Sequence, residues 1–236
     1  MLELSGKTAF VFGVASEDSI AWAICQKLAS AGVTLYLGYQ KRFMSRIFQL
    51  KDKLPQIAGF FPLDVASDET TKEFFDAFSA ENPGKKADIL IHAIGFAPRS
   101  CFDRPILFVE DQDINTAMTI SANSLQRCLK FALPYLNANS STITLTYAAS
   151  NRYVPSYGIM SMAKAALECW TRELACHLGP EGHRVNAISS GPIRTIAASG
   201  IPGFDNILNH VEHNSPLRRK VNQDDVAGAT LWLASP

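Results

Sequence analysis

Six short apolar segments alternate with amphipathic segments along this chain, and this alternation most constrains its fold. Strands are expected at residues 8–14, 33–39, 58–65, 87–94, 141–147 and 184–189. Helices are expected at residues 19–31, 41–50, 113–133, 156–178 and 224–233, and a further helix after an N-cap at Ser67. Strands that are apolar throughout are buried on both faces, which is typical of parallel sheets. The prediction is a single α/β domain over residues 1–236 with a doubly wound, Rossmann-type parallel sheet.

Charge and hydropathy exclude several classes of protein. Lys and Arg number 22, Asp and Glu also number 22, and the formal net charge is +0, which excludes a strongly basic nucleic-acid binder. Hydrophobic residues make up 47% of the chain, too many for a disordered protein. No apolar run approaches the ~20 residues of a transmembrane helix, and the first residues lack a signal-peptide pattern. We therefore expect a cytoplasmic protein with neither a nucleic-acid nor a membrane partner.

The cysteines and histidines give no sign of a metal site. The five cysteines form no Cys-x-x-Cys motif, and the five histidines add no liganding pattern. The cysteines are Cys25, Cys101, Cys128, Cys169 and Cys176. We expect reduced thiols and no bound metal.

A candidate phosphate site follows the first expected strand. Gly13 ends that strand, and Ser19 precedes the first expected helix, whose N-terminus offers free N–H groups to a pyrophosphate. The segment has one glycine and not the Gly-x-Gly-x-x-Gly pattern, so an ordinary loop with Ser19 as N-cap is the alternative.

The next two strand ends carry polar residues suited to a nucleotide. Gln40 stands where many NAD-binding sheets carry an acid for the ribose 2′-hydroxyl. Lys41 and Arg42 follow it and are candidates for a 2′-phosphate, or form a solvated helical turn. Asp64 and Val65 end the third strand, where they would contact adenine or simply begin the next helix.

Tyr157 and Lys164 form the candidate catalytic pair. Seven residues at about 100° each place both side chains on one helix face, about 10.5 Å apart along the axis. A phenol there would donate a hydrogen bond to a developing oxyanion, and a lysine would hold ribose hydroxyls. Such a pair also occurs on ordinary helix surfaces. Tyr147, Gly95 and Thr195, which follow other strands, are expected at the same edge of the sheet.

Several motifs resemble those of NADH-dependent enoyl-acyl-carrier-protein reductases, a divergent family of the short-chain dehydrogenase/reductase superfamily. The resemblance covers nearly the whole chain. Its motifs are Gly13-Val-Ala-Ser, Ser19-Ile-Ala-Trp, the segment 92–98, Tyr157-x6-Lys164-Ala-Ala-Leu-Glu168 and the segment 179–201. Ordinary superfamily members use Tyr-x3-Lys, but Met160 stands four residues before Lys164.

The resemblance implies a function and a set of site residues. The function is reduction of trans-2-enoyl thioesters on an acyl carrier protein in fatty-acid elongation, with NADH as cofactor and NADPH as the alternative. Tyr147, Tyr157 and Lys164 would be catalytic. The cofactor residues would be Gly13, Ser19, Ile20, Gln40, Asp64, Val65, Ile94, Lys164, Ile193, Arg194, Thr195, Ile196 and Ala197. Ala97, Tyr147, Tyr157, Ile201, Phe204 and Ile207 would contact substrate, the last three from a mobile lid or, alternatively, as the buried face of a short helix.

The chain departs from the family pattern at two places. It stops at Pro236, where the family continues with a further strand, so a homotetramer is expected only with a complete C-terminus. Tyr147 is followed by Ala148-Ala-Ser-Asn-Arg152 in place of the family's bulkier segment. A short-chain carbonyl reductase, which would need Tyr-x3-Lys, and a non-catalytic nucleotide-binding pseudoenzyme remain the alternatives.

Overall fold

The computed structural model describes residues 4–196 and 198–236. Its strands form one parallel sheet in the order β3-β2-β1-β4-β5-β6. They are β1 (Thr8–Phe12), β2 (Thr34–Tyr39), β3 (Ile57–Pro62), β4 (Ala87–His92), β5 (Leu136–Thr146) and β6 (Arg184–Ser189). The order runs outward in both directions from β1 and β4, which is the doubly wound Rossmann arrangement predicted from the sequence. The fold-class prediction is confirmed.

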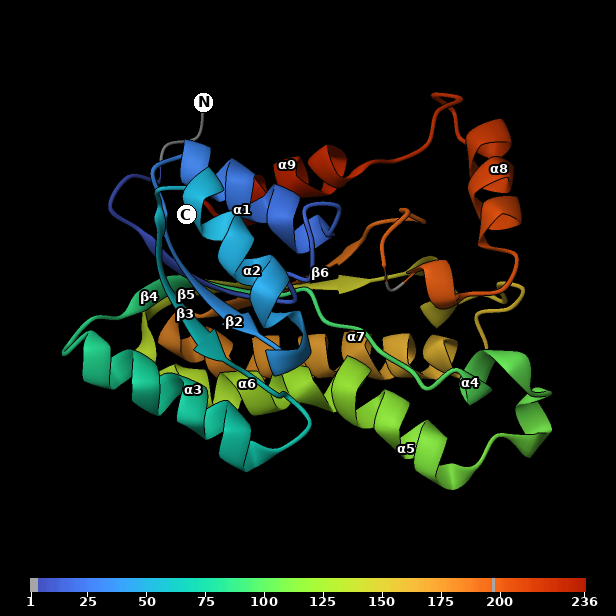
Figure 1. Ribbon diagram of the computed structural model, residues 1–236, viewed down its shortest axis with the longest axis horizontal. Helices are drawn as coiled ribbons and strands as arrows, with labels where there is room; N and C mark the ends of the chain where they lie inside the picture. Colours follow the sequence, from blue (N-terminus) through green and yellow to red (C-terminus); the bar gives the residue numbers. More distant parts are fainter. Residues whose placement is uncertain (1–3, 197) are drawn as a thin grey trace.

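Helices cover both faces of the sheet (Figure 1). They are α1 (Ile20–Ser30), α2 (Met44–Leu50), α3 (Asp68–Glu81), α4 (Ser100–Asp103), α5 (Asp111–Met118), α6 (Ser124–Ala132), α7 (Ile159–Leu178), α8 (Phe204–Asn214) and α9 (Gln223–Ala234). In Figure 1, α1, α2 and α9 lie above the sheet, and α3, α6 and α7 lie below it. The α8 helix stands apart at the upper right, opposite α4.

A hydrophobic core lies on each face of the sheet, and alternate residues of β1 contribute to the two cores. Ala9 and Val11 point into the core under α1 and α9, whereas Phe10 and Phe12 point into the core under α3 and α6. Phe10 meets Phe78 of α3 edge-to-face, with ring centroids 4.8 Å apart. Because both faces of the strand are buried, it is apolar throughout.

Two expected helices differ from their predicted form. The segment 113–133 holds α5 and α6 separated by the π-helical turn η4 (Thr119–Asn123). The helix expected from residue 156 begins only at Ile159, because Ser156 and Gly158 have φ angles of 62° and 50°, outside the helical region.

Three further features of the described residues concern membrane-spanning helices, metal-binding clusters and disulfides. None of their helices is both long and apolar enough to cross a membrane. They contain no group of three or more His, Cys, Asp or Glu side chains that could hold a metal ion. All five cysteines are free thiols.

Candidate active site

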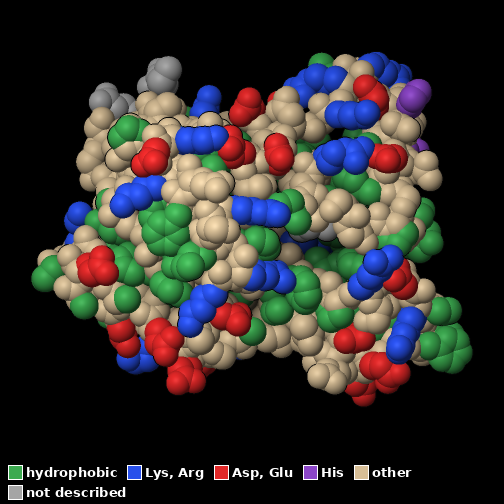
Figure 2. Space-filling view, viewed as in Figure 1, with side chains coloured by type: hydrophobic (Ala, Val, Ile, Leu, Met, Phe, Trp, Pro, Cys, Tyr) green, Lys and Arg blue, Asp and Glu red, His purple; other side chains and the backbone are tan. Residues whose placement is uncertain are grey.

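A cavity of about 910 Å³ lies at the carboxyl ends of the strands. Its walls come from the loops after all six strands, from the start of α7 and from the segment before α8. Figure 2 shows the surface hollowed here, with Lys and Arg side chains gathered above it near α8. Ligands of doubly wound sheets bind at this edge, so the cavity is the candidate site.

The β1–α1 loop packs its backbone directly against the loop after β4. Gly13 has φ of 105°, and a Cβ added there would lie 2.0 Å from the carbonyl oxygen of Ala93. Only glycine fits this position. Ser19 caps α1 by accepting a hydrogen bond from the Trp22 N–H at 3.2 Å. Gly13, Ser19 and Ile20 all line the cavity, as the sequence predicts for a pyrophosphate at this helix N-terminus.

Ser16 is a cavity residue that the sequence analysis did not single out. Its Oγ is buried, and it has no hydrogen-bond partner among residues 4–196 and 198–236. Buried hydroxyls are rarely left unpaired, so an unpaired one beside a helix N-terminus fits a ligand oxygen. Together with the close approach at Gly13, Ser16 shows that this end of the cavity fits the phosphates of a dinucleotide.

The ends of β2 and β3 place some of the predicted nucleotide residues in the cavity and not others. Gln40, Arg42 and Val65 line it. Lys41 does not, and neither does Asp64, whose exposed carboxylate accepts a hydrogen bond from the Ala66 N–H at 3.0 Å.

Arg42 lies between two aromatic rings at this end of the cavity. Its guanidinium carbon lies 4.8 Å from the ring centroid of Phe43 and 5.6 Å from that of Phe96. These cation-π contacts hold the guanidinium at the cavity wall.

Tyr147 and Tyr157 face each other at the opposite end. Their ring centroids are 4.9 Å apart, and the rings are tilted by 53°. Tyr157 is only 8% exposed, and burial, followed by the nearby Tyr147, raises the pKa of its phenol well above the ordinary value. Burial also raises the pKa of Tyr147. Both phenols therefore keep their protons at neutral pH and are able to donate hydrogen bonds.

Lys164 lies in the same cavity on the buried face of α7. It is 7% exposed, and its Nζ donates a hydrogen bond to the carbonyl oxygen of Leu145 at 2.8 Å. Burial lowers the pKa of this ammonium to about 8, against an opposing effect of Glu168. The side chain reaches toward the loop after β4, because its Nζ lies 3.7 Å from an ideal Cβ on Gly95. Met160, one turn before it, also lines the cavity.

The wall after β4 is held at both ends by the π-helical turn and the residue that follows it. Ser121 accepts a hydrogen bond from the Phe96 N–H at 2.8 Å and donates one to the Phe96 carbonyl at 2.7 Å. Ser124 contacts Nε2 of the buried His92 at 2.8 Å, and Thr144 contacts its Nδ1 at 2.9 Å. These contacts position Ile94, Gly95, Phe96 and Ala97, which line the cavity. The sequence predicted Ile94, Gly95 and Ala97 as site residues but not the side chains that hold them in place.

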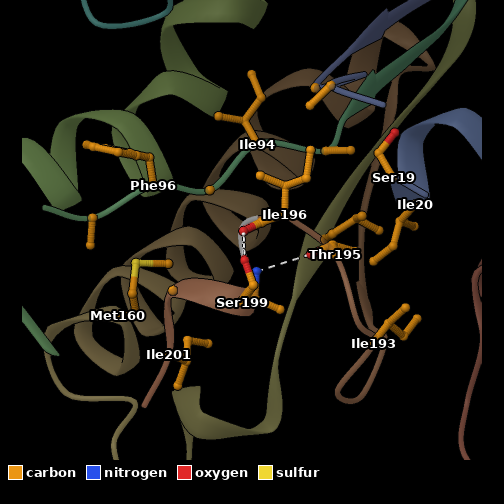
Figure 3. A pocket seen from close by; sticks show the side chains of 18 of the residues that line it. Ser19, Ile20, Ile94, Phe96, Met160, Ile193, Thr195, Ile196, Ser199 and Ile201 are labelled. Atoms are coloured by element: carbon orange, nitrogen blue, oxygen red, sulfur yellow. Dashed lines mark hydrogen bonds between the residues drawn. The ribbon is translucent and has the colours of Figure 1, made fainter. Parts of the chain in front are cut away.

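The segment after β6 closes the remaining side, as Figure 3 shows for Ile193, Thr195, Ile196 and Ile201. Thr195 accepts a hydrogen bond from the Ala198 N–H at 3.2 Å. Arg194 does not line the cavity, since it pairs with Asp205 at the start of α8. Ala197 lies outside the described residues.

The expected substrate contacts lie largely in the cavity. Ala97, Ile201 and Phe204 line it, and Phe102 joins them although the sequence did not single it out. Ile207 is half-buried on α8 and does not line it. The apolar end beside the two tyrosines therefore suits a chain of carbon atoms.

Comparison with known proteins gives a consistent result. The family model described as enoyl-(acyl carrier protein) reductase matches residues 13–236. The chain is 40% identical to the NADH-dependent enoyl-[acyl-carrier-protein] reductase of Synechocystis sp., over 100% of this chain and 92% of the relative. It is 38% identical to the corresponding reductase of Escherichia coli K12, over 98% and 88%.

The similar solved structures are also enoyl-acyl-carrier-protein reductases. The NADH enoyl-[acyl-carrier-protein] reductase of Aquifex aeolicus has a TM-score of 0.93 at 33% identity, covering 98% of this chain and 90% of that one. The Bacillus cereus enoyl-acyl carrier protein reductase with NADP+ and indole naphthyridinone has a TM-score of 0.94 at 36% identity, covering 100% and 91%.

Proposed function

Because this chain belongs to the enoyl-acyl-carrier-protein reductase family, we propose that its cavity reduces trans-2-enoyl thioesters on an acyl carrier protein with NADH. One observation carries the assignment of the site. A single cavity joins a helix N-terminus with an unpaired buried hydroxyl to a buried phenol and a buried lysine. The first end suits a dinucleotide, and the second suits a reacting carbonyl.

We propose distinct roles for the residues at the two ends. Ser16, Ser19 and the N–H groups that begin α1 would hold the pyrophosphate, and Lys164 would hold the nicotinamide ribose. The nicotinamide supplies a hydride to the β-carbon of the enoyl group.

Tyr157 acts where negative charge collects, on the thioester oxygen. Its phenol keeps its proton because burial raises its pKa, so it donates a hydrogen bond to that oxygen. Tyr147 lies against Tyr157 and would orient the thioester. Ala97, Ile201 and Phe204 would surround the acyl chain and keep water from it.

The sequence position of Met160 argues against an ordinary short-chain carbonyl reductase. In that class a tyrosine stands four residues before the lysine. Here the Met160 side chain occupies that position in the cavity wall and has no proton to donate. The tyrosine that would donate the hydrogen bond in this chain is Tyr157, seven residues before Lys164.

We also propose the remaining features of the biological context. The substrate would arrive on an acyl carrier protein, and the 236 residues would act as one reductase domain in the cytoplasm, where free cysteines persist. With a complete C-terminus, copies of the chain would assemble as a homotetramer. Exposed apolar side chains such as Leu107 (87% exposed) and Phe108 (70%) support self-association, and light scattering of the purified protein measures it.

Two substitutions test the proposed site. Tyr157→Phe should lower turnover of crotonyl-CoA on the order of 10²–10³-fold, because one oxyanion donor is lost. Its affinity for NADH should stay nearly unchanged. Lys164→Ala is the matched variant and should weaken NADH binding, which fluorescence titration measures. Wild-type turnover in Tyr157→Phe would remove Tyr157 from the reaction, and unchanged NADH affinity in Lys164→Ala would remove Lys164 from the cofactor site.

A further inference from the structure

We propose that Glu168 is a positioning residue that keeps Lys164 charged for cofactor binding, with its carboxylate held in place by Thr146. The inference rests on the proposed function, in which Lys164 binds the nicotinamide ribose. It assigns a role to a side chain that contacts neither cofactor nor substrate, since Glu168 does not line the cavity.

Two neighbouring hydrogen bonds fix this arrangement. Leu145 and Thr146 are consecutive residues at the end of β5, and Lys164 and Glu168 are one helical turn apart on α7. The Lys164 Nζ donates to the Leu145 carbonyl at 2.8 Å, and the Thr146 hydroxyl donates to Glu168 Oε1 at 2.7 Å. Because i and i+4 side chains share a helix face, the carboxylate and the ammonium lie on the same side of α7 and both contact the end of β5.

The buried ammonium needs such a partner. Lys164 is 7% exposed, and removing a charge from water disfavours the charged form. The Leu145 carbonyl accepts one of its three N–H groups, and two remain available to a ligand. A carboxylate set back by one turn favours the charge without occupying the ligand's place. The pKa of Lys164, about 8, reflects burial lowering it and Glu168 opposing that effect.

Among residues 4–196 and 198–236, the other carboxylate that lines the cavity is that of Asp103 on α4, and it pairs with Arg99. On β4, His92 is fully buried and its pKa is lowered to about 3, so it is neutral. After β5 and before α7, Tyr147 and Tyr157 are neutral phenols. The π-helical turn, with sequence TISAN, and η6 (Ala148–Ser150) contain no charged residue, and the nearest cation beyond η6 is Arg152.

Charged residues on the remaining packed elements are engaged elsewhere or exposed. On α6, Arg127 and Lys130 both pair with Asp68. Arg184 at the start of β6 binds the carbonyls of Leu233 and Ser235. On α5, Asp111 lies in the exposed first turn, and Asp113 accepts a hydrogen bond from Ser100. Arg172 and Glu173 lie on the exposed side of α7.

The inference predicts a specific pH dependence. NADH affinity of the wild type should fall as the pH rises through about 8, where Lys164 loses its proton. Glu168→Gln keeps an oxygen that accepts from Thr146 but removes the charge. This variant should shift the midpoint of the fall by about one pH unit to lower pH, the size expected for removing a charge about 10 Å away at an effective dielectric constant of about 20.

Three further variants separate charge from structure. Thr146→Val removes the hydrogen bond and keeps the carboxylate, so its midpoint should lie closer to the wild type than that of Glu168→Gln. Glu168→Asp keeps the charge one methylene farther back, and its midpoint should lie between those of Glu168→Gln and the wild type. Glu173→Gln removes an exposed carboxylate from the same helix and should leave the midpoint unchanged.

The experiment is a fluorescence titration with NADH across the pH range, joined to ¹⁵N NMR of the lysine Nζ in protein without NADH. Both should report the lower midpoint in Glu168→Gln. A wild-type midpoint in Glu168→Gln, or an equal shift in Thr146→Val, would overturn the inference. Should Glu168→Gln not fold, a wild-type midpoint in Glu168→Asp would overturn it. Failure of the wild type to bind NADH would instead refute the proposed function, and the NMR titration would still test the charge of Lys164.

Discussion

At the scale of single residues, Arg42 and Lys41 differ in a way the sequence does not reveal. The two cations are adjacent, but only Arg42 lines the cavity, where its guanidinium lies between Phe43 and Phe96. The sequence can place both after a strand. Which one faces the ligand depends on the 3₁₀ turn η1 (Lys41–Phe43), which stands where a regular helical start was expected.

This difference makes cofactor choice testable. We expect the wild type to prefer NADH, with the cavity-lining Gln40 binding a ribose hydroxyl, and to bind NADPH more weakly through Arg42. Arg42→Ala should therefore reduce NADPH affinity more than Lys41→Ala does, and it should change NADH affinity less. Dissociation constants of both cofactors for the three proteins measure this. A larger effect of Lys41→Ala would contradict the assignment of Arg42.

His92 makes a second residue-scale prediction, which concerns stability. Burial, together with the charge of Lys164, lowers the pKa of the imidazole to about 3, whereas the unfolded chain binds a proton near the ordinary value of about 6.5. Between these values the unfolded state holds more protons, so the free energy of unfolding falls as the pH falls. We expect a loss of roughly 1 kcal/mol per pH unit below about 6.

Urea unfolding at several pH values measures this slope. His92→Gln cannot take up the proton, so its slope above the range where carboxylates titrate should be shallower than that of the wild type. Equal slopes in the two proteins would show that the buried imidazole is not responsible.

At the scale of elements, the π-helical turn explains why part of the site escaped sequence reasoning. Ser121 hydrogen-bonds both the N–H and the carbonyl of Phe96, which is 25 residues away in sequence. The segment TISAN contains ordinary helical residues, so the periodicity predicts one unbroken helix. By contrast, Gly13 and the Tyr157–Lys164 spacing carry local signals, because a tight turn and a shared helix face are set by nearby residues.

The segment of residues 198–215 supports an element-scale prediction about closure. The segment includes α8, whose buried residues are Phe204 and Leu208. Pro202 and Gly203, which precede α8 within the segment, are exposed. Ile201 and Phe204 line the cavity and would each gain ~1–2 kcal/mol from apolar burial against an acyl chain. Hydrogen exchange should be faster here than in the strands of the unliganded protein, and it should slow when NAD and an acyl ligand bind.

Ile207 provides an internal comparison for that experiment. It does not line the cavity, so its protection should change only if α8 moves as a unit. Equal exchange of the segment with and without ligand would mean that it is fixed, and the acyl chain would then have to bind elsewhere.

At the scale of the whole molecule, the doubly wound parallel sheet follows from the sequence, because apolar strand segments alternate with helical segments along the chain. The position of the cavity follows in turn, since the strand ends meet at one edge. The hydrogen bonds of the polar side chains in and around the cavity could not be predicted from the sequence. The unpaired Ser16 hydroxyl and the His92 contacts depend on loop conformations set by distant packing.

The central claim is that this cavity reduces an enoyl thioester and not a simple ketone. NADH oxidation followed by absorbance with crotonyl-CoA and with a simple ketone, in parallel at equal enzyme concentration, tests it most directly. We predict steady oxidation with crotonyl-CoA and none above background with the ketone, because Tyr157 and the apolar wall suit a conjugated thioester. Oxidation with the ketone alone, or with neither compound while NADH still binds, would contradict the claim.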